Sequence, residues 1–121
     1  MNVFPRAMRV RGRESVGRLF VKGEGGFVYP FRYLVCVGEG EGVAVLVSVP
    51  KKYHKRANRR NVLKRRMREA FRTLSRELVA TSAREGRRVE IALIYCSKES
   101  VEFNPVCDAV EKILGQIARK L

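Results

Sequence analysis

The sequence predicts an α+β domain in which helices and strands alternate along the chain. Residues 27–49 are rich in aromatic and β-branched residues and are interrupted by glycines, as paired strands are. Residues 63–78 repeat apolar side chains at helical spacing, and residues 91–96 form an unbroken apolar run typical of a strand covered on both faces. A chain of 121 residues has room for one such domain, which we place at 1–121.

The first element is a short helix over residues 13–22. Val16, Leu19 and Phe20 follow the i, i+3, i+4 spacing that puts side chains on one helical face. Gly23 is placed to end this helix, because glycine is the preferred residue just beyond a helix C-terminus.

Two strands and a turn are predicted next. Residues 27–37 are expected to form a strand that Pro30 breaks or confines to an edge. The glycine-rich segments 23–26 and 38–42 are interpreted as turns, since they lack the ending of a phosphate loop and contain glutamates. Residues 43–49 are the return strand, so that 27–37 and 43–49 are expected to pair as a hairpin.

A long helix is predicted from Asn58, its N-cap, to about Ala83, with Gly86 beyond its end. One face of this helix is apolar. Its residues are Leu63, Met67, Ala70, Phe71, Leu74 and Leu78.

Residues 89–96 are expected to form a buried strand, and Asn104-Pro105 begins a last helix. The inward face of that helix is predicted from its apolar spacing. Its residues are Val106, Val110, Ile113, Leu114 and Ile117.

Positive charge is the strongest feature of the composition. The chain has 26 Lys+Arg against 12 Asp+Glu, a net charge of +14, with an isoelectric point near 10.6. Residues 51–72 contain eleven basic residues and one acid, and residues 1–22 contain six basic residues and one acid. Such a surface attracts polyanions, so nucleic acid is the first partner to consider.

The basic residues of the long helix form a stripe. With about 100° per residue, Arg65, Arg68 and Arg72 lie within roughly 40° of Asn61, beside the apolar face, and Glu69 points elsewhere. Like charges at this spacing repel and destabilise a helix. The stripe is therefore interpreted as a ridge for phosphates, which relieve the repulsion and release counterions when they bind.

The chain lacks the residues that nucleases use for catalysis. General acid–base cleavage requires a pair of groups such as two histidines, whereas His54 is the only histidine and is expected to be a minor RNA contact. Two-metal hydrolysis requires clustered carboxylates, whereas Asp108 is the only aspartate. We therefore predict no catalytic residue and no metal site in this chain.

Cellular location is predicted from three features. The three cysteines are odd in number and lack paired spacing, which indicates reduced, mostly buried thiols and no zinc site. Arginines occupy the N-terminal region where a signal peptide would be apolar. The longest apolar run has six residues, far fewer than the roughly 18 that span a bilayer. A cytoplasmic protein without membrane contact is expected.

Residues 60–72 resemble the signature helix of the protein subunit of bacterial ribonuclease P. That signature, R-N-x-x-K-R-x-x-R-E-x-[FY], is met at every fixed position. Ser48-Val49-Pro50-Lys51-Lys52 resembles the S-V-S-K-K that ends the preceding strand in this family, with Pro50 in place of the second serine. The resemblance extends to the first helix (14–23), to Tyr29-Pro30-Phe31-Arg32 and to Ile91-Ala92-Leu93-Ile94. Val16 stands where the family often has an aromatic residue.

The resemblance implies an α/β sandwich of order αβββαβα, with a four-stranded sheet and a left-handed βαβ crossover, like the second domain of ribosomal protein S5. It also implies a monomeric accessory subunit in a 1:1 complex with the catalytic RNA of ribonuclease P. The protein would also bind the 5′ leader of precursor tRNA. The RNA would hydrolyse the precursor, using Mg²⁺ that is bound mainly by the RNA and not tightly by the protein.

The resemblance implies two sets of contact residues, one for the RNA subunit and one for the 5′ leader. The set for the RNA subunit is Lys51, Lys52, Lys55, Arg56, Arg60, Asn61, Lys64, Arg65, Arg68 and Arg72. The set for the leader is Arg9, Arg11, Phe20, Phe31 and Tyr33. Strand alternation places Phe31, Tyr33 and Val35 on one face and Arg32, Leu34 and Cys36 on the other, and leaves open which face meets RNA.

Alternatives remain open for the function and for the aromatic residues. A structural RNA-binding protein, such as a small ribosomal protein, has similar charge and size, and only the signature helix argues against it. A DNA-binding protein would place the basic helix in a major groove, but no dimerisation heptad is present. Phe20 and Tyr33 are either core residues or platforms on which bases stack.

Overall fold

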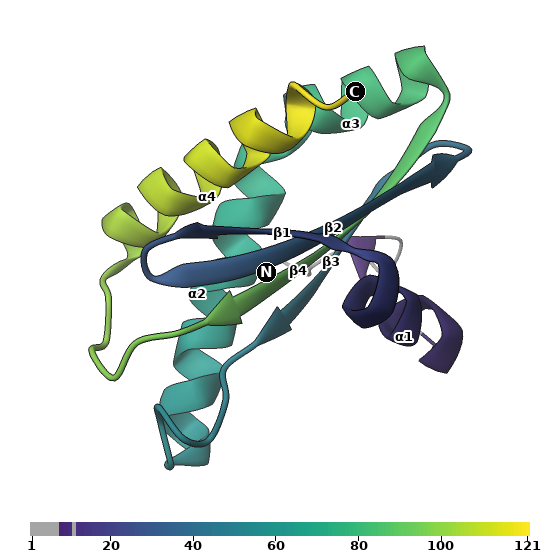
Figure 1. The fold of residues 1–121 in the computed structure, drawn as a ribbon. Helices are drawn as coiled ribbons and strands as arrows, with labels where there is room; N and C mark the ends of the chain where they lie inside the picture. The colour runs from purple at the N-terminus through teal and green to yellow at the C-terminus, as the bar shows by residue number, and fades with distance from the viewer. Residues whose placement is uncertain (1–7, 11) are drawn as a thin grey trace.

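The computed structural model describes residues 8–10 and 12–121, and its elements follow the expected order αβββαβα (Figure 1). One change is that two consecutive helices stand where one long helix was predicted. The elements are α1 (Arg13–Lys22), β1 (Glu24–Val28), β2 (Phe31–Glu39), β3 (Val43–Ser48), α2 (Ala57–Leu74), α3 (Arg76–Glu85), β4 (Arg87–Tyr95) and α4 (Phe103–Ala118).

The four strands lie in the order β1-β2-β4-β3. The predicted hairpin between 27–37 and 43–49 is wrong, because β4 lies between β2 and β3, antiparallel to β2 and parallel to β3. The hairpin of this fold is instead β1–β2, which turns at Tyr29-Pro30. The segment 24–26, predicted to be a turn, is therefore part of β1. β4 takes the central position because its side chains are buried on both faces.

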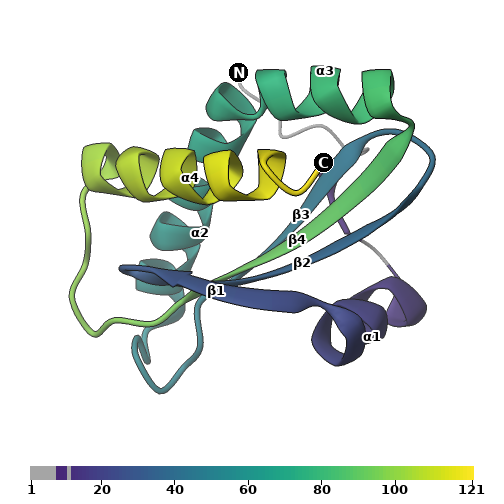
Figure 2. The same ribbon diagram turned by 45° about the horizontal axis from the view of Figure 1, so that its top comes forward.

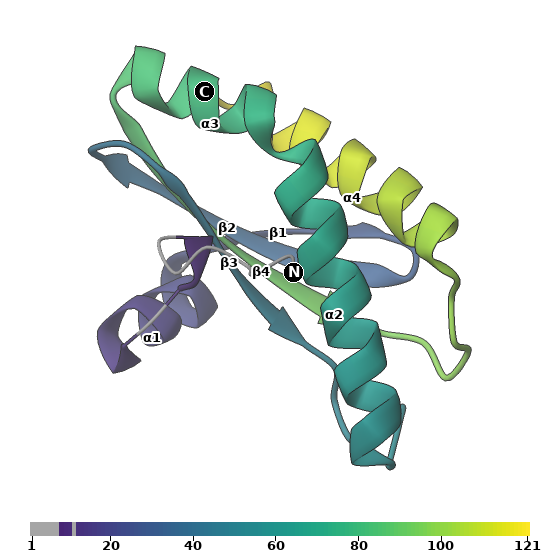
Figure 3. The ribbon, with the colours of Figure 1, turned by 180° about the vertical axis from the view of Figure 1, so that it is seen from behind.

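The connection from β3 to β4 passes through α2 and α3 on one side of the sheet. In Figure 3, α2 lies in front of the sheet, and β4 lies to the left of β3 when both strands are turned to point upward. The crossover is therefore left-handed. Right-handed crossovers dominate among proteins, so the family resemblance predicts this hand and the periodicity of the sequence does not.

The long helix breaks at Ser75, which is buried between α2 and α3. The break redirects the chain so that Leu78 and Ser82, on α3, are also buried against the fold. The Ser82 hydroxyl donates to the Arg87 carbonyl and accepts from the Gly42 amide at 2.8 Å. Gly86 ends α3 with φ of 63°, as predicted for a glycine at this place.

The sheet separates two unequal layers, which Figure 2 shows from another side: α3 and α4 lie on one face and α1 lies on the other. The predicted alternation along β2 is confirmed, because Phe31, Tyr33 and Val35 pack in the large core under α2 and α4. Residues of the opposite face join a small core under α1. All five predicted inward residues of α4 are buried.

The Tyr33 side chain is a structural part of the β1–β2 hairpin. It is 3% exposed, and its hydroxyl donates to Gln116 Oε1 on α4. Its ring lies over Gly26 so closely that a Cβ on that glycine would be 2.4 Å from the ring. Because Gly26 has no side chain, the Tyr33 ring can pack between β1 and α4.

We expect Gly26→Ala to lower the free energy of unfolding by about 1–3 kcal/mol, because the added methyl displaces the Tyr33 ring from a packed position. Gly25→Ala is the matched control on the same strand, since its Cβ would make ordinary contacts, the nearest at 3.5 Å. Its expected change is within about 0.5 kcal/mol. Urea unfolding of both variants measures the difference, and equal stabilities would contradict this position of the Tyr33 ring.

Candidate nucleic-acid interface

The basic stripe lies on the outer side of α2. Leu63 and Met67, on the neighbouring apolar face of the helix, are buried in the core, as predicted. Of the stripe residues, Asn61 and Arg65 are exposed, and Arg68 is half-buried. Arg72 and Lys64 are also half-buried. The stripe thus extends from open solvent to the edge where α2 meets the rest of the fold.

The N-cap of α2 is Arg56, which has no capping side-chain hydrogen bond, so the prediction of Asn58 as the N-cap is wrong. The Asn58 side chain accepts from the amide of Arg59, one residue farther along. The first turn of α2 contains no acidic residue. Basic side chains near the positive end of a helix are unfavourable, so this end carries an electrostatic cost that a bound anion would relieve.

The N-terminal segment brings a further arginine to this side of the molecule. Residues 9 and 10 run along the free edge of β3, where the Val10 amide donates to the Val45 carbonyl at 3.2 Å. The pKa of Arg68 is lowered, first by burial and then by the positive charge of Arg9. Arg9 and Arg68 are therefore electrostatic neighbours. Arg11, predicted with Arg9 to contact the leader, lies outside the described residues.

Glu69 does not point away from the basic stripe, as the helical spacing predicts, but forms an ion pair with Arg72. Arg72 Nε donates to one carboxylate oxygen at 3.2 Å, and Arg72 Nη2 donates to the other at 2.5 Å. This pairing lowers the pKa of Glu69 and raises the pKa of Arg72. Arg72 is thus partly neutralised within the protein, unlike Arg65, for which the structure gives no acidic partner among the described residues.

The loop before α2 presents four more predicted basic residues to solvent. These exposed residues are Lys51, Lys52, Lys55 and Arg56. Arg60 holds this loop, because its guanidinium donates to the carbonyls of His54 at 3.1 Å and Lys55 at 2.7 Å.

His54 was expected to be a minor RNA contact, and the structure corrects this. Its side chain is buried, with Nε2 2.8 Å from the Ser97 carbonyl, to which it donates. Its ring meets the ring of Tyr95 edge-on at 5.4 Å between centroids. His54 therefore joins the loop to the end of β4, and a buried imidazole is not available to RNA.

The sheet face opposite α2 is covered by α1 at one end only (Figure 1). Beyond α1, this face presents Phe27, Arg32 and Ile94, which are neighbours across β1, β2 and β4. Phe27 is 60% exposed, and Phe20 on α1 is 52% exposed. Sequence reasoning missed Phe27, although the pairing of β1 with β2 places it on the face of Arg32.

Two of the aromatic residues predicted to contact the leader do not reach this surface. Phe31 is fully buried, and Tyr33 lies in the core on the other side of the sheet. The structure therefore corrects the prediction for both side chains, because a buried ring offers no face on which a base can stack. Phe20 remains the exposed member of the predicted aromatic set.

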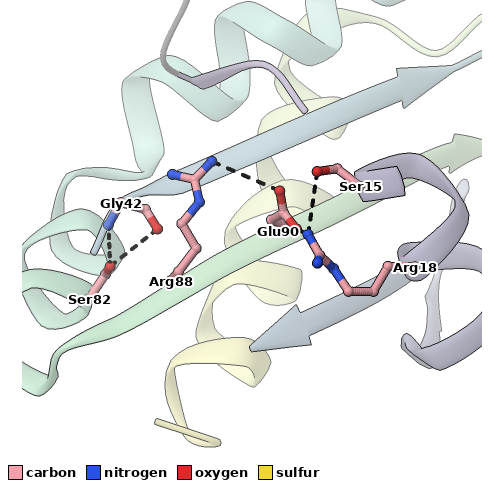
Figure 4. Close-up of polar contacts among 6 residues, drawn as sticks. All are labelled: Ser15, Arg18, Gly42, Ser82, Arg88 and Glu90. Carbon is pink, nitrogen blue, oxygen red and sulfur yellow. Dashed lines mark hydrogen bonds and ion pairs between the residues drawn. The ribbon is translucent and has the colours of Figure 1, made fainter. Parts of the chain in front are cut away.

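The helix α1 is held on the sheet by apolar packing and by an ion pair. Leu19 is the buried residue of the helix, and it packs with Ala92 in the small core. Arg18 donates to Glu90 on β4 at 3.1 Å and to the Ser15 hydroxyl at 3.3 Å, as Figure 4 shows. The Glu90 side chain is 9% exposed and has a second, longer contact to Arg88 at 3.9 Å. Val16 also packs against this small core, so apolar contacts and a partly buried ion pair together position α1.

In the part of the chain that the structure describes, no group of three or more histidine, cysteine or acidic residues is placed to hold a metal ion. The three cysteines are free and half-buried. In the same residues, no helix combines the length and apolar character needed to cross a bilayer.

Comparison with known proteins agrees with the resemblance. Residues 4–118 match the family model described as Ribonuclease P. The chain is 36% identical over 110 residues to the ribonuclease P protein component of Porphyromonas gingivalis strain W83, covering 88% of this chain and 80% of that protein. It is also 36% identical over 104 residues to the component from Chlorobaculum tepidum, covering 78% and 68%.

Solved structures share the fold. The ribonuclease P protein of Staphylococcus aureus superposes with a TM-score of 0.72 at 20% identity, covering 93% of this chain and 96% of that chain. The ribonuclease P protein of Thermotoga maritima superposes with a TM-score of 0.66 at 24% identity, covering 89% and 96%. At these identities the structures support the fold alone.

The ion pair between Arg18 and Glu90 should contribute measurably to stability. In a double-mutant cycle of Arg18→Ala and Glu90→Gln, we expect a coupling of about 0.5–1 kcal/mol, because half of the Arg18 side chain is solvated. Urea unfolding measures this coupling, which should shrink as salt is added. Arg88→Ala with Glu90→Gln is the matched cycle for the longer contact. A larger coupling there would show that Arg88, and not Arg18, is the main partner of Glu90.

Proposed function

Because this chain belongs to the family of bacterial ribonuclease P protein components, we propose that it binds the catalytic RNA of that enzyme and the 5′ leader of precursor tRNA. In this function it promotes the Mg²⁺-dependent, RNA-catalysed removal of the leader. The observation that carries the proposal is the basic outer side of α2, which presents Asn61, Arg65 and Arg68 in a chain that matches the family along its length.

The RNA-subunit surface consists of this stripe and the loop before it. Arg65 on α2 and Lys51, Lys52 and Lys55 on the loop are exposed, and Arg60 fixes the loop to the helix. Phosphates that bind here release counterions and relieve the repulsion between the arginines. Arginine suits this purpose because its planar guanidinium grips a phosphate through two hydrogen bonds.

The leader surface is proposed on the sheet face that α1 leaves open. Leu19 packs toward the sheet and Arg18 reaches Glu90, so Phe20, which follows Leu19 by about 100°, lies on the opposite flank of α1. On the same sheet face, Arg32 and its partner Phe27 lie four positions along β2 from Cys36, the residue paired with Glu90. Exposed aromatic rings beside an arginine are the combination that binds single-stranded nucleic acid without reading its sequence.

Catalysis is assigned to the RNA partner and not to this chain. This division is proposed because the sequence has a single histidine, the buried His54, and a single aspartate, Asp108. Magnesium would be held mainly by the RNA, in a complex of one protein with one RNA. The protein would lower the demand for Mg²⁺ by neutralising phosphates and by holding the leader of the substrate.

We expect that adding the protein to its cognate catalytic RNA lowers the Mg²⁺ concentration needed to process precursor tRNA at its 5′ end. Cleavage assays over a Mg²⁺ titration, with and without protein, measure this shift. The protein alone should not cleave. An unchanged Mg²⁺ requirement would favour the alternative function, a structural RNA-binding protein such as a small ribosomal protein.

Replacing Arg65 and Arg68 by alanine should weaken binding to the catalytic RNA and reduce its salt dependence. The slope of log affinity against log salt should fall by about 0.7–0.9 for each phosphate that the variant no longer binds. Lys112→Ala with Arg119→Ala is the matched control, because it also removes two exposed positive charges. Lys112 lies on α4, and Arg119 is the C-cap residue of that helix. If both double variants change the slope equally, the stripe is not a specific contact surface.

Phe20→Ala should reduce the discrimination between precursor and mature tRNA, since a stacked base contributes about 1–3 kcal/mol. Its unfolding free energy should stay within about 0.5 kcal/mol of wild type because the ring is exposed. Val21→Ala, at an exposed position of the same helix, is the control for α1. Tyr33→Phe should retain discrimination because Tyr33 is buried. If Phe20→Ala discriminates between precursor and mature tRNA as well as wild type does, Phe20 is not part of the leader surface.

A further inference from the structure

We propose that a pocket at the start of α2 is a second phosphate-binding site for the catalytic RNA, separate from the basic stripe. This inference rests on the proposed function, because it takes the RNA as the partner. The pocket has a volume of about 270 Å³ and lies between α2 and the loop that follows β4. Its lining residues are Arg56, Asn58, Arg59, Val62, Arg66 and Ser100.

The lining of the pocket is strongly basic and polar. It comprises three arginines, one amide, one hydroxyl and a single apolar side chain, Val62. None of the lining residues is aromatic, so the pocket offers no ring on which a base would stack. Its chemistry suits a phosphate group of the RNA backbone, which is bound without regard to sequence.

The pocket lies on a different flank of α2 from the basic stripe. At about 100° per residue, Val62 and Arg66 lie roughly 100° and 140° around the helix from Asn61. Arg66 faces the loop that follows β4, because its guanidinium donates to the Val101 carbonyl at 2.9 Å. Arg68, in contrast, has Arg9 on the β3 edge as its electrostatic neighbour. The two arginines therefore address opposite sides of the helix.

The loop that follows β4 forms one wall of the pocket, and Tyr95 holds this loop in place. The buried Tyr95 hydroxyl donates to the Glu99 carbonyl and accepts from the Val101 amide at 2.9 Å. Ser100 stands between these two anchored residues and lines the pocket. Ser100 thus belongs to a loop segment that is fixed on both sides, which lowers the cost of ordering it around a ligand.

The charge of the pocket is not balanced inside the protein. Among the described residues, no acidic side chain forms an ion pair with Arg56, Arg59 or Arg66. Arg56 and Arg59 also stand at the start of α2, where basic side chains are unfavourable. A phosphate would relieve both costs. With the stripe on its other flank, α2 would then contact two separate segments of RNA backbone.

The test compares the salt dependence of binding to the catalytic RNA for paired variants of the full chain. Arg59→Ala with Arg66→Ala should lower the slope of log affinity against log salt by about 0.7–0.9 for each phosphate that is released, and Arg56, which also belongs to the loop before α2, is left unchanged. Lys112→Ala with Arg119→Ala again controls for net charge. When the pocket variant is combined with Arg65→Ala and Arg68→Ala, the decreases in log affinity should add, as expected for separate sites.

Ser100→Ala provides a test that leaves every charge in place. We expect its affinity to fall about 2- to 12-fold, the range for one hydrogen bond, with the salt slope unchanged. If the pocket double variant has the same salt slope as the α4 control, and the stripe variant still lowers the slope, the second site is overturned but the proposed function is not. If neither the pocket nor the stripe variant differs from the control, the proposed RNA-binding function itself is overturned.

Discussion

The central position of β4 is the constraint on which the rest of the structure depends. This strand is buried on both faces, so it must lie inside the sheet, between β2 and β3. The chain can reach that position from β3 only by crossing over one face of the sheet, and α2 and α3 make this crossing. The basic helix is therefore held beside β3, and the opposite face is left to α1.

Burial of the apolar side of α2 compensates for the repulsion on its outer side. Leu63 and Met67 are almost completely buried, while Arg65 stays exposed. Such a helix would be unfavourable alone, because like charges repel along it. Packing against the sheet thus provides the stability, and the arginines remain available for a partner.

The two basic segments of the sequence do not form two isolated surfaces. Residues 9 and 10 run along the β3 edge, and Arg9 is close enough to Arg68 to affect its pKa. The helix α1, farther along the chain, packs on the other face of the sheet. The N-terminal segment therefore adds Arg9 to the side of the proposed RNA-subunit surface, while α1 lies on the sheet face proposed for the leader.

The sequence alone determined which parts of the chain are helical, the faces of β2 and α4, and the basic character of α2, because these depend on the spacing of nearby residues. The tertiary structure decided the strand order, the break at Ser75 and the burial of Tyr33 and His54. These features depend on residues far apart in sequence: β4 separates two strands that are close in the chain, and His54 meets the carbonyl of Ser97. Local spacing carries no information about such pairings, so only packing of the whole chain could select them.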